Sequence, residues 1–257
     1  MSRFSTVTII NVKPMKRYII LTLMMLAVVA TQAQEFGLSF SYFIPKNGYF
    51  STPISPFSIR GLGFDFNRYL ALEAGASLYR MSGLNMKDLP FESKDPLVGP
   101  NFTIFVPVEL VLQFHGQKAD FDIKGGAFGF HGFSQHINYG NFDRALRKAE
   151  GWEVVNSDFS FKNKPGWGYH GGAELTLYIF KDVGVSLEAN YLVGESKFPL
   201  KGRYTGGTTT LETREVEYAD AKIDFTGWEF SVGLIFNSGN SGPSAPKKAM
   251  KRKKRRR

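Results

Sequence analysis

The sequence predicts an all-β protein: an eight-stranded antiparallel up-and-down transmembrane β-barrel with long extracellular loops. Three observations lead to this prediction. Large apolar residues alternate with small or polar ones over eight runs, no stretch after residue 33 has the ~18 consecutive apolar residues of a membrane helix, and long and short connections alternate. The 257 residues are 43% hydrophobic and include no cysteine, which excludes disulfide scaffolds, thiolate metal sites and cysteine nucleophiles.

The first segment along the chain has the pattern of a secretory signal peptide. An uncharged apolar run at 18–30 follows Met15-Lys16-Arg17 and ends in small residues up to Ala33. A bilayer span takes about 20 residues, so this run is too short for one. We therefore expect cleavage after Ala33 and export of the mature protein, with a buried core helix as the alternative.

Eight runs then alternate with period two, as β-strands with one apolar and one polar face do. In the fourth run, for example, Ile104, Val106, Val108 and Leu110 stand at every second position. Each run is long enough for a tilted membrane-crossing strand, which needs ~9 to 11 residues. The runs are 35–44, 56–66, 69–81, 102–114, 120–133, 167–180, 183–194 and 223–236.

The connections between the runs are long and short in turn. Short connections at 67–68, 115–119 and 181–182 are typical of periplasmic turns, and long polar ones are typical of extracellular loops. The long connections are 45–55, 82–101, 134–166 and 195–222. This alternation indicates a protein of the cell outer membrane.

Alternation alone does not separate a membrane barrel from a soluble, lipocalin-like barrel. The nearly continuous Leu, Val, Ile and Phe face favours contact with lipid, because small and hydrogen-bonding residues suit the narrow interior of eight strands. Aromatic residues also gather at both ends of the runs, as in the two girdles at headgroup level. They are Phe36, Phe66, Tyr69, Phe114, Phe121, Phe180 and Phe236 at the turn end, and Tyr42, Phe57, Phe102, Phe133 and Trp167 at the loop end.

The last run alternates and closes on an aromatic residue, with Trp228, Phe230 and Phe236 on its apolar face. With this terminal strand, residues 34–236 resemble the small eight-stranded outer-membrane β-barrel proteins of Gram-negative bacteria, especially the barrel-domain family common in Bacteroidetes. The resemblance implies that the barrel insertion machinery recognises the terminal strand during assembly. Members of that family often end at such a phenylalanine, whereas this chain continues for 21 residues.

Charged residues recur at positions that the alternation assigns to the interior. Because buried charges have to be paired, we expect a lumen charge network with Arg60 among its cations. For two such carboxylates, a glycosidase-like acid/base pair is the alternative. The expected members of the network are Glu73, Glu109, Asp122, Lys124, Glu174, Glu188 and Glu229.

A weak catalytic candidate lies at the third long connection, where His131, Ser134 and His170 stand near Glu174. A histidine and a serine at the rim resemble those of the lipid A deacylases of this fold, in which the two lie close together on one strand. Here His131 and Ser134 are three residues apart, which places them on opposite faces of a strand. We therefore expect no catalysis and no cofactor. No metal site is expected either, since no two histidines have ligand spacing.

Two long connections contain structure of their own. An Asn141 cap, good helix formers and a closing Gly151 predict a helix of about two turns in 134–166, placed over the barrel mouth. The run Thr208-Thr209-Thr210 in 195–222 indicates a β-extension of the barrel or an adhesive edge.

The net charge of +9 comes from the two ends of the chain. Nine of the residues from Lys247 to Arg257 are Lys or Arg, whereas 34–246 hold 19 basic and 23 acidic residues. A nucleic-acid-binding surface is therefore not expected. The Ser, Gly and Pro residues after Phe236 predict a flexible linker. The basic tail is then either a solvated periplasmic tail or a contact to an anionic periplasmic partner.

The sequence thus predicts a non-catalytic outer-membrane protein with a structural or interaction role, anchored in outer-membrane lipid. One alternative is a lipid-modifying enzyme with a site at the extracellular rim. Another is a narrow passive pore, for which eight strands leave little room. The expected segments are a signal peptide at 1–33, whose residues 1–14 precede a better start at Met15 than at Met1, a barrel at 34–236, and a linker and basic tail at 237–257.

Overall fold

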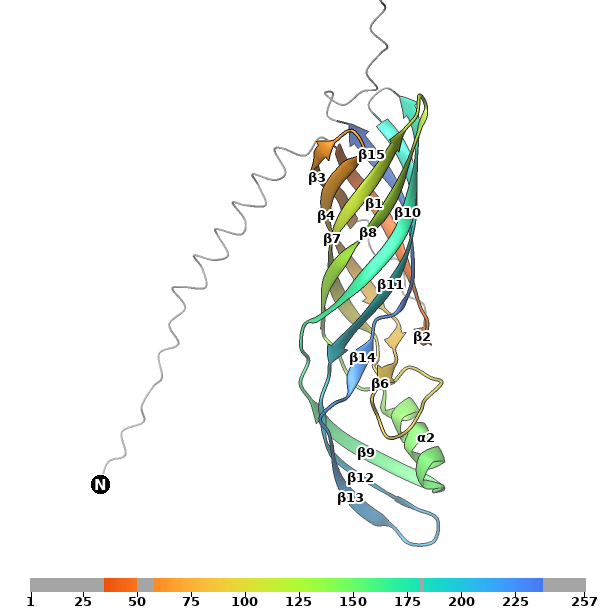
Figure 1. Ribbon diagram of the computed structural model, residues 1–257. Helices are drawn as coiled ribbons and strands as arrows, with labels where there is room; N and C mark the ends of the chain where they lie inside the picture. Colours follow the sequence, from red (N-terminus) through yellow and green to blue (C-terminus); the bar gives the residue numbers. More distant parts are fainter. Residues whose placement is uncertain (1–34, 50–57, 181–182, 238–257) are drawn as a thin grey trace, which may run out of the picture.

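The computed structural model describes residues 35–49, 58–180 and 183–237, so the expected signal peptide and basic tail lie outside the described residues. Eight described strands form a closed antiparallel ring, because the last strand pairs with the first (Figure 1). Around the ring they are β1 (Glu35–Pro45), β3 (Ser58–Asn67), β4 (Leu70–Met81), β7 (Asn101–His115), β8 (Ala119–Phe133), β10 (Gly166–Phe180), β11 (Val183–Lys197) and β15 (Gly227–Asn237). The predicted fold class is confirmed.

The wall of the barrel is apolar outside and largely polar inside. On β7 the side chains of Ile104, Val106 and Val108 are exposed, whereas Glu109 is buried in the interior. The twelve residue steps from Phe102 to Phe114, at ~3.3 Å per residue and a tilt of about 40°, give a band roughly 30 Å tall. A closed barrel with such a wall belongs in a bilayer, and the protein is an outer-membrane barrel.

Aromatic side chains are exposed at both ends of this band, as the girdles require. The side chains of Phe36 and Phe57 lie outside the described residues. The expected girdle residues that are exposed are Phe66, Tyr69, Phe114, Phe121, Phe180 and Phe236 at the turn end, and Phe102, Phe133 and Trp167 at the loop end. Among the described residues, no helix is both long and apolar enough to cross a bilayer.

A β-bulge in β3 determines which of its residues face the barrel interior. Gly61 has φ of 71°, a left-handed conformation that suits glycine, and the pairing of β3 with β4 shifts there. Ser58 and Arg60 face the interior before the bulge, and Gly63 faces it afterwards. The bulge therefore keeps both halves of β3 with their apolar residues outside.

The prediction of one strand at 223–236 is wrong for its first residues. Residues Lys222–Asp224 form the separate short strand β14, which pairs with β11 and with β6 (Met86–Lys87). Phe225, Thr226 and Gly227 are buried in succession, so the alternation fails between β14 and β15. The chain turns inward here because Phe225 enters the mouth of the barrel.

Beyond the loop end, the long connections fold into a domain made of one sheet and one helix (Figure 1). We call it the extracellular domain after the side of the membrane on which it is expected to lie. The sheet has the order β13-β12-β9, and α2 (Tyr139–Glu150) packs on β9 through Phe142, Ala145 and Leu146. The three strands are β9 (Val154–Phe161), β12 (Leu200–Gly207) and β13 (Glu212–Tyr218), and a short pair joins β2 (Gly48–Tyr49) to β5 (Gly83–Leu84).

Two expectations for these loops need correction. The helix begins earlier than Asn141, with Asn138 as its N-cap, and it runs for 12 residues before Gly151 ends it at φ of 68°. The Asn138 side chain accepts a hydrogen bond from Asn141 N, so the residue expected as the cap is instead the donor to it. The strands after 195 do not simply lengthen the barrel wall, because β12 and β13 join β9 in a sheet of their own.

We expect the two ends of the barrel to differ in accessibility on intact cells. The chain has no native cysteine, so Leu211→Cys in the β12–β13 connection should react with an impermeant thiol reagent. Gln117→Cys in the β7–β8 turn is the matched control, exposed in the structure but expected to face the periplasm. Labelling at Gln117→Cys without labelling at Leu211→Cys would show that the orientation is inverted.

Candidate functional site

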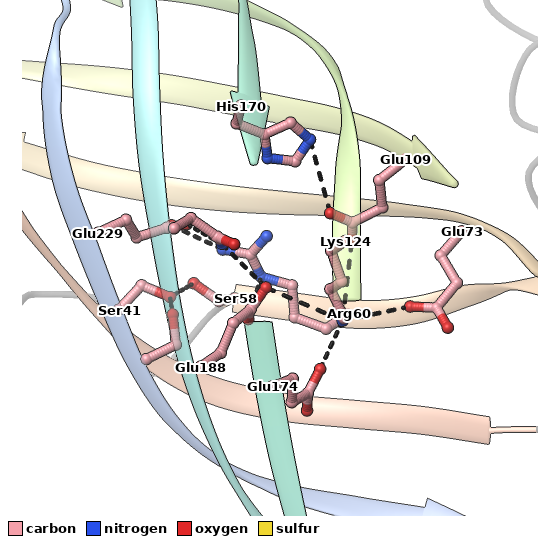
Figure 2. Close-up of polar contacts among 12 residues, drawn as sticks. Ser41, Ser58, Arg60, Glu73, Glu109, Lys124, His170, Glu174, Glu188 and Glu229 are labelled. Atoms are coloured by element: carbon pink, nitrogen blue, oxygen red, sulfur yellow. Dashed lines mark hydrogen bonds and ion pairs between the residues drawn. The ribbon is translucent and has the colours of Figure 1, made fainter. Parts of the chain in front are cut away.

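A dense cluster of ionisable side chains lies inside the barrel, where Lys124 of β8 is close to four carboxylates (Figure 2). Its Nζ lies 2.5 Å from Glu174 Oε2 and 3.4 Å from Glu73 Oε2. The same atom lies 3.8 Å from an oxygen of Glu109 and 3.8 Å from one of Glu188. These glutamates come from β10, β4, β7 and β11, so one ammonium joins five of the eight strands.

Arg60 forms the second half of this cluster. Its Nη2 lies 2.6 Å from Glu229 Oε1, and its Nε lies 4.0 Å from Glu188 Oε2. The Tyr79 hydroxyl also donates to Glu229. Asn190 Nδ2 donates to both Glu188 and Glu229, at 2.9 Å each. Glu188 therefore joins the Lys124 and Arg60 groups into one lumen charge network.

The network is buried and acidic. The side chains in its ion pairs with Lys124 and Arg60 are at most 13% exposed. Asp122 also lies on the inner side of β8, and its Oδ1 has no hydrogen-bond partner among the described residues. The described interior at this level thus holds six carboxylates and two basic side chains, Lys124 and Arg60, in addition to His170. Every expected network residue faces the interior, including Arg60.

His170 lies beside the network on the inner side of β10, with Nε2 3.5 Å from Glu109 Oε2. Such an arrangement could move a proton, but it offers little space for a substrate. The hollow next to Glu73 and Gln113 has a volume of only about 20 Å³. Among the described residues, no group of three or more metal-ligating side chains could hold a metal ion.

A layer of aromatic rings fills the interior on the loop side of the network. Phe225 stacks on Phe130, with ring centroids 4.4 Å apart, and on Phe43 at 4.7 Å. Phe105 and Phe128 are 4.8 Å apart and complete the layer. All five rings are buried. The expectation of a wholly small or hydrogen-bonding interior is therefore wrong in this half of the barrel.

The expected catalytic candidates are not brought together. His131 is exposed on the outer side of β8, whereas His170 and Glu174 face the interior from β10. His170 pairs with Gly126, five residues from His131 along β8, a separation of roughly 16 Å along the strand. Ser134 is exposed just beyond β8 at φ of 56°.

The extracellular domain holds a second polar cluster. Glu150 accepts from Tyr204 Oη at 2.7 Å and from Arg214 Nη1 at 2.6 Å, and the Arg214 guanidinium lies 4.7 Å from the centre of the Trp152 ring. Burial and the bond to Glu150 raise the pKa of Tyr204, and burial raises the pKa of Tyr218 to about 12. Both phenols therefore stay protonated at neutral pH, and the cluster fixes α2 against the sheet.

The opposite face of the same sheet is open. A hollow of about 590 Å³ lies over it, lined by charged side chains from all three strands. Lys201 and Glu217 pair there at 3.3 Å. Arg203 stands opposite Asp158 on β9 and Glu215 on β13, in the middle of the face. This outer face is polar and carries both signs of charge.

Comparisons with known proteins find similarity of structure only. No family model matches the chain, and no curated protein matches it in sequence. The outer membrane protein OprG from Pseudomonas aeruginosa is similar with a TM-score of 0.49 and 12% identity, over 80% of this chain and 96% of that one. Ail, the attachment invasion locus protein of Yersinia pestis, has a TM-score of 0.31 and 12% identity, over 79% and 95%. A major outer membrane protein from Thermus thermophilus has a TM-score of 0.40 and 9% identity, over 79% and 98%.

Proposed function

We propose that this protein is a non-catalytic anchor that presents a folded domain outside the cell. The observation that carries the proposal is the contrast between a filled barrel and structured loops. The lumen charge network and the aromatic layer occupy successive levels of the interior. The extracellular domain meanwhile leaves a hollow of about 590 Å³ open over its outer face. Binding is proposed to take place on that face.

The apolar core supports a rigid presentation of this domain. It continues from Phe105 inside the barrel through Phe225 and Val98 to Phe142 of α2 and Phe159 of β9. A domain joined by a continuous core keeps a fixed position relative to the membrane. That suits a surface that meets partners outside the cell.

Because the interior is filled, we expect the barrel not to conduct ions. Purified protein reconstituted into a planar bilayer should give no steady conductance, because the aromatic layer and the network fill successive levels of the described interior. An open porin of known conductance is the positive control, and retention of heat-modifiable migration shows that the barrel is folded. Reproducible single-channel steps would instead establish the passive-pore alternative.

Loss of a lipid-hydrolysing activity in Ser134→Ala, with the barrel intact, would contradict the non-catalytic part of the proposal.

Partner binding by the outer face can be tested by reversing its charges. Arg203→Glu together with Lys201→Glu should abolish site-specific photo-cross-links formed from position 160, next to both residues in the hollow. The matched control is Lys94→Glu with Lys148→Glu, two exposed lysines outside the hollow. Cross-links that persist in the first variant would exclude this face as the binding surface.

We propose in addition that the basic tail, Lys247 to Arg257, contacts an anionic component of the periplasm. Nine positive charges could not be buried in hydrocarbon, and a Ser-, Gly- and Pro-rich linker separates them from β15. Export through a signal peptide at 1–33 and membership of the Bacteroidetes barrel-domain family belong to the same proposal. They are supported by the leader pattern and by the alternating terminal strand.

Deleting residues 247–257 is expected to leave insertion of the barrel unchanged and to weaken binding to anionic envelope material. The difference should disappear at high salt, because screening removes contacts between exposed charges. Heat-modifiable migration measures insertion, and co-sedimentation at low and high salt measures binding. Failure of the truncated chain to insert, together with normal insertion of Phe236→Ala, would mean that the tail belongs to the fold.

A further inference from the structure

A hollow of about 400 Å³ lies at the turn end of the barrel, on the side of β7 and β8. Its apolar part is formed by outward side chains at the turn-end edge of the lipid-facing wall. Its polar part is formed by the β3–β4 and β7–β8 turns. The residues that line this turn-end hollow are Arg68, Tyr69, Phe114, His115, Gly116, Ala119, Asp120, Phe121 and Leu175.

The apolar part forms a continuous surface. Phe114 of β7 pairs with Phe121 of β8, which pairs with Leu175 of β10, so the three residues form one row across three strands. All three are exposed, as is Tyr69 at the β3–β4 turn. Tyr69 is held next to β7 by the hydrogen bond from Gln113 N to its carbonyl, at 2.9 Å. An acyl chain can lie along this row.

The Asp120 carboxylate in the hollow accepts three hydrogen bonds from neighbouring groups. Asp120 accepts from His115 Nδ1 at 3.1 Å, from Gly116 N at 3.0 Å and from Tyr178 Oη at 2.8 Å. These bonds fix the turn. Asp120 forms an ion pair with His115 and none with Arg68 or Lys118 among the described residues.

Two cations in this region have no carboxylate partner among the described residues. The guanidinium of Arg68 lies 5.7 Å from the centre of the Tyr69 ring, and no ion pair of Arg68 forms within the described part of the chain. Lys118 does not itself line the hollow but lies in the β7–β8 turn between Gly116 and Ala119, which do. Its carbonyl accepts from Tyr178 N at 3.0 Å, and its side chain is exposed without an ion pair in the same ranges. Both stand where the lipid-facing wall meets the headgroup layer.

We propose that the turn-end hollow binds a phospholipid of the inner leaflet of the outer membrane, with a preference for an anionic headgroup. The phosphate is held by Arg68 and Lys118, and an acyl chain lies along Tyr69, Phe114 and Phe121. A phosphate diester matches the arginine fork, and aromatic rings at the membrane interface match the upper part of the acyl chain. The inference rests on the proposed orientation of the barrel, since the turn end must face the periplasm.

The test is a titration of the full chain, folded in neutral detergent, with phosphatidylglycerol, followed by native mass spectrometry. Phosphatidylcholine with the same acyl chains is the zwitterionic reference. Arg68→Ser with Lys118→Ser should weaken phosphatidylglycerol binding about 30-fold, from roughly 1 kcal/mol for each basic residue. The matched control is Lys94→Ser with Lys148→Ser, which removes the same charge from the extracellular side and should leave binding unchanged.

Competition separates a lipid site from a site for free anions. Neither inorganic phosphate nor glycerophosphoglycerol, which has no acyl chain, should displace the lipid at equal concentration. Equal binding of the two lipids, unchanged binding in the first variant, an equal loss in the control variant or displacement by either competitor would each overturn the inference. Heat-modifiable migration and bilayer conductance are measured separately, so loss of this inference leaves the anchor proposal standing.

Discussion

Replacing Lys124 with methionine is expected to lower the free energy of unfolding of the barrel by about 3–5 kcal/mol, because it leaves a set of buried carboxylates without their cation. Lys124 lies within 4 Å of Glu73, Glu109, Glu174 and Glu188. Methionine fills similar space but supplies no charge, so the loss is electrostatic. Urea unfolding in detergent micelles, followed by the change in heat-modifiable migration, measures it.

The pH dependence identifies the cause. Protonation neutralises the unpaired carboxylates, so Lys124→Met should recover stability relative to the parent protein as the pH falls. Lys124→Met combined with Glu174→Gln should be more stable than the sum of the two single losses, since the residues contact each other. Lys118→Met, at an exposed turn position, is the matched control. A constant difference between the variant and the parent at every pH would show that packing, not charge, is lost.

Phe225→Ala is expected to cost about 3–5 kcal/mol, the range for removal of a buried phenylalanine from a well-packed core. The Phe225 ring is 0% exposed and stacks on Phe43 and Phe130, so the cavity cannot collapse without moving both. Because the ring joins the barrel to the extracellular domain, protease sensitivity of the loops should rise as well. A chemical denaturation midpoint and limited proteolysis measure the two effects.

The matched control is Leu211→Ala, at a residue 71% exposed in the β12–β13 connection. This variant should change stability by no more than about 0.5 kcal/mol. Equal losses in the two variants would show that Phe225 is not part of a packed layer.

The ring of strands could be predicted because a barrel wall has lipid on one side and a polar interior on the other. Residues along each strand must therefore alternate between apolar and polar. Once Glu109 is assigned to the interior, Ile104 and Leu112 must face outward, and the structure places them so. The same logic placed Glu188 and Glu229 on neighbouring strands, where Asn190 joins them. The individual ion pairs depend on side-chain rotamers and on the bulge at Gly61, which the pattern of residues does not reveal.

The aromatic layer was missed although its signal was present. The alternation that places Lys124 inside places Phe128 and Phe130 inside too, and Glu109 likewise places Phe105. Large rings on the inner face contradict a uniformly polar lumen, so they could have indicated a plug. Phe225 stands four residues before Glu229 in the expected run 223–236, so the same alternation places it inside, although in the structure it lies outside any regular strand. The pairing of β9 with β12 joins residues from 39 (Phe161 and Leu200) to 53 (Val154 and Gly207) positions apart, which no local pattern reports.

The pairing of the first barrel strand with the last has a consequence for the timing of folding. Ser41 and Ser231 share a hydrogen bond across the closing seam, although they are 190 residues apart in the chain. Contacts of such long sequence separation form slowly, since the entropy of closing the loop must be lost before they contribute. Until β15 is synthesised and delivered, every partly assembled sheet has two open edges that can pair with another chain. The risk of aggregation is therefore greatest in the interval between emergence of β1 and arrival of β15, and shortening that interval should raise the yield of folded protein.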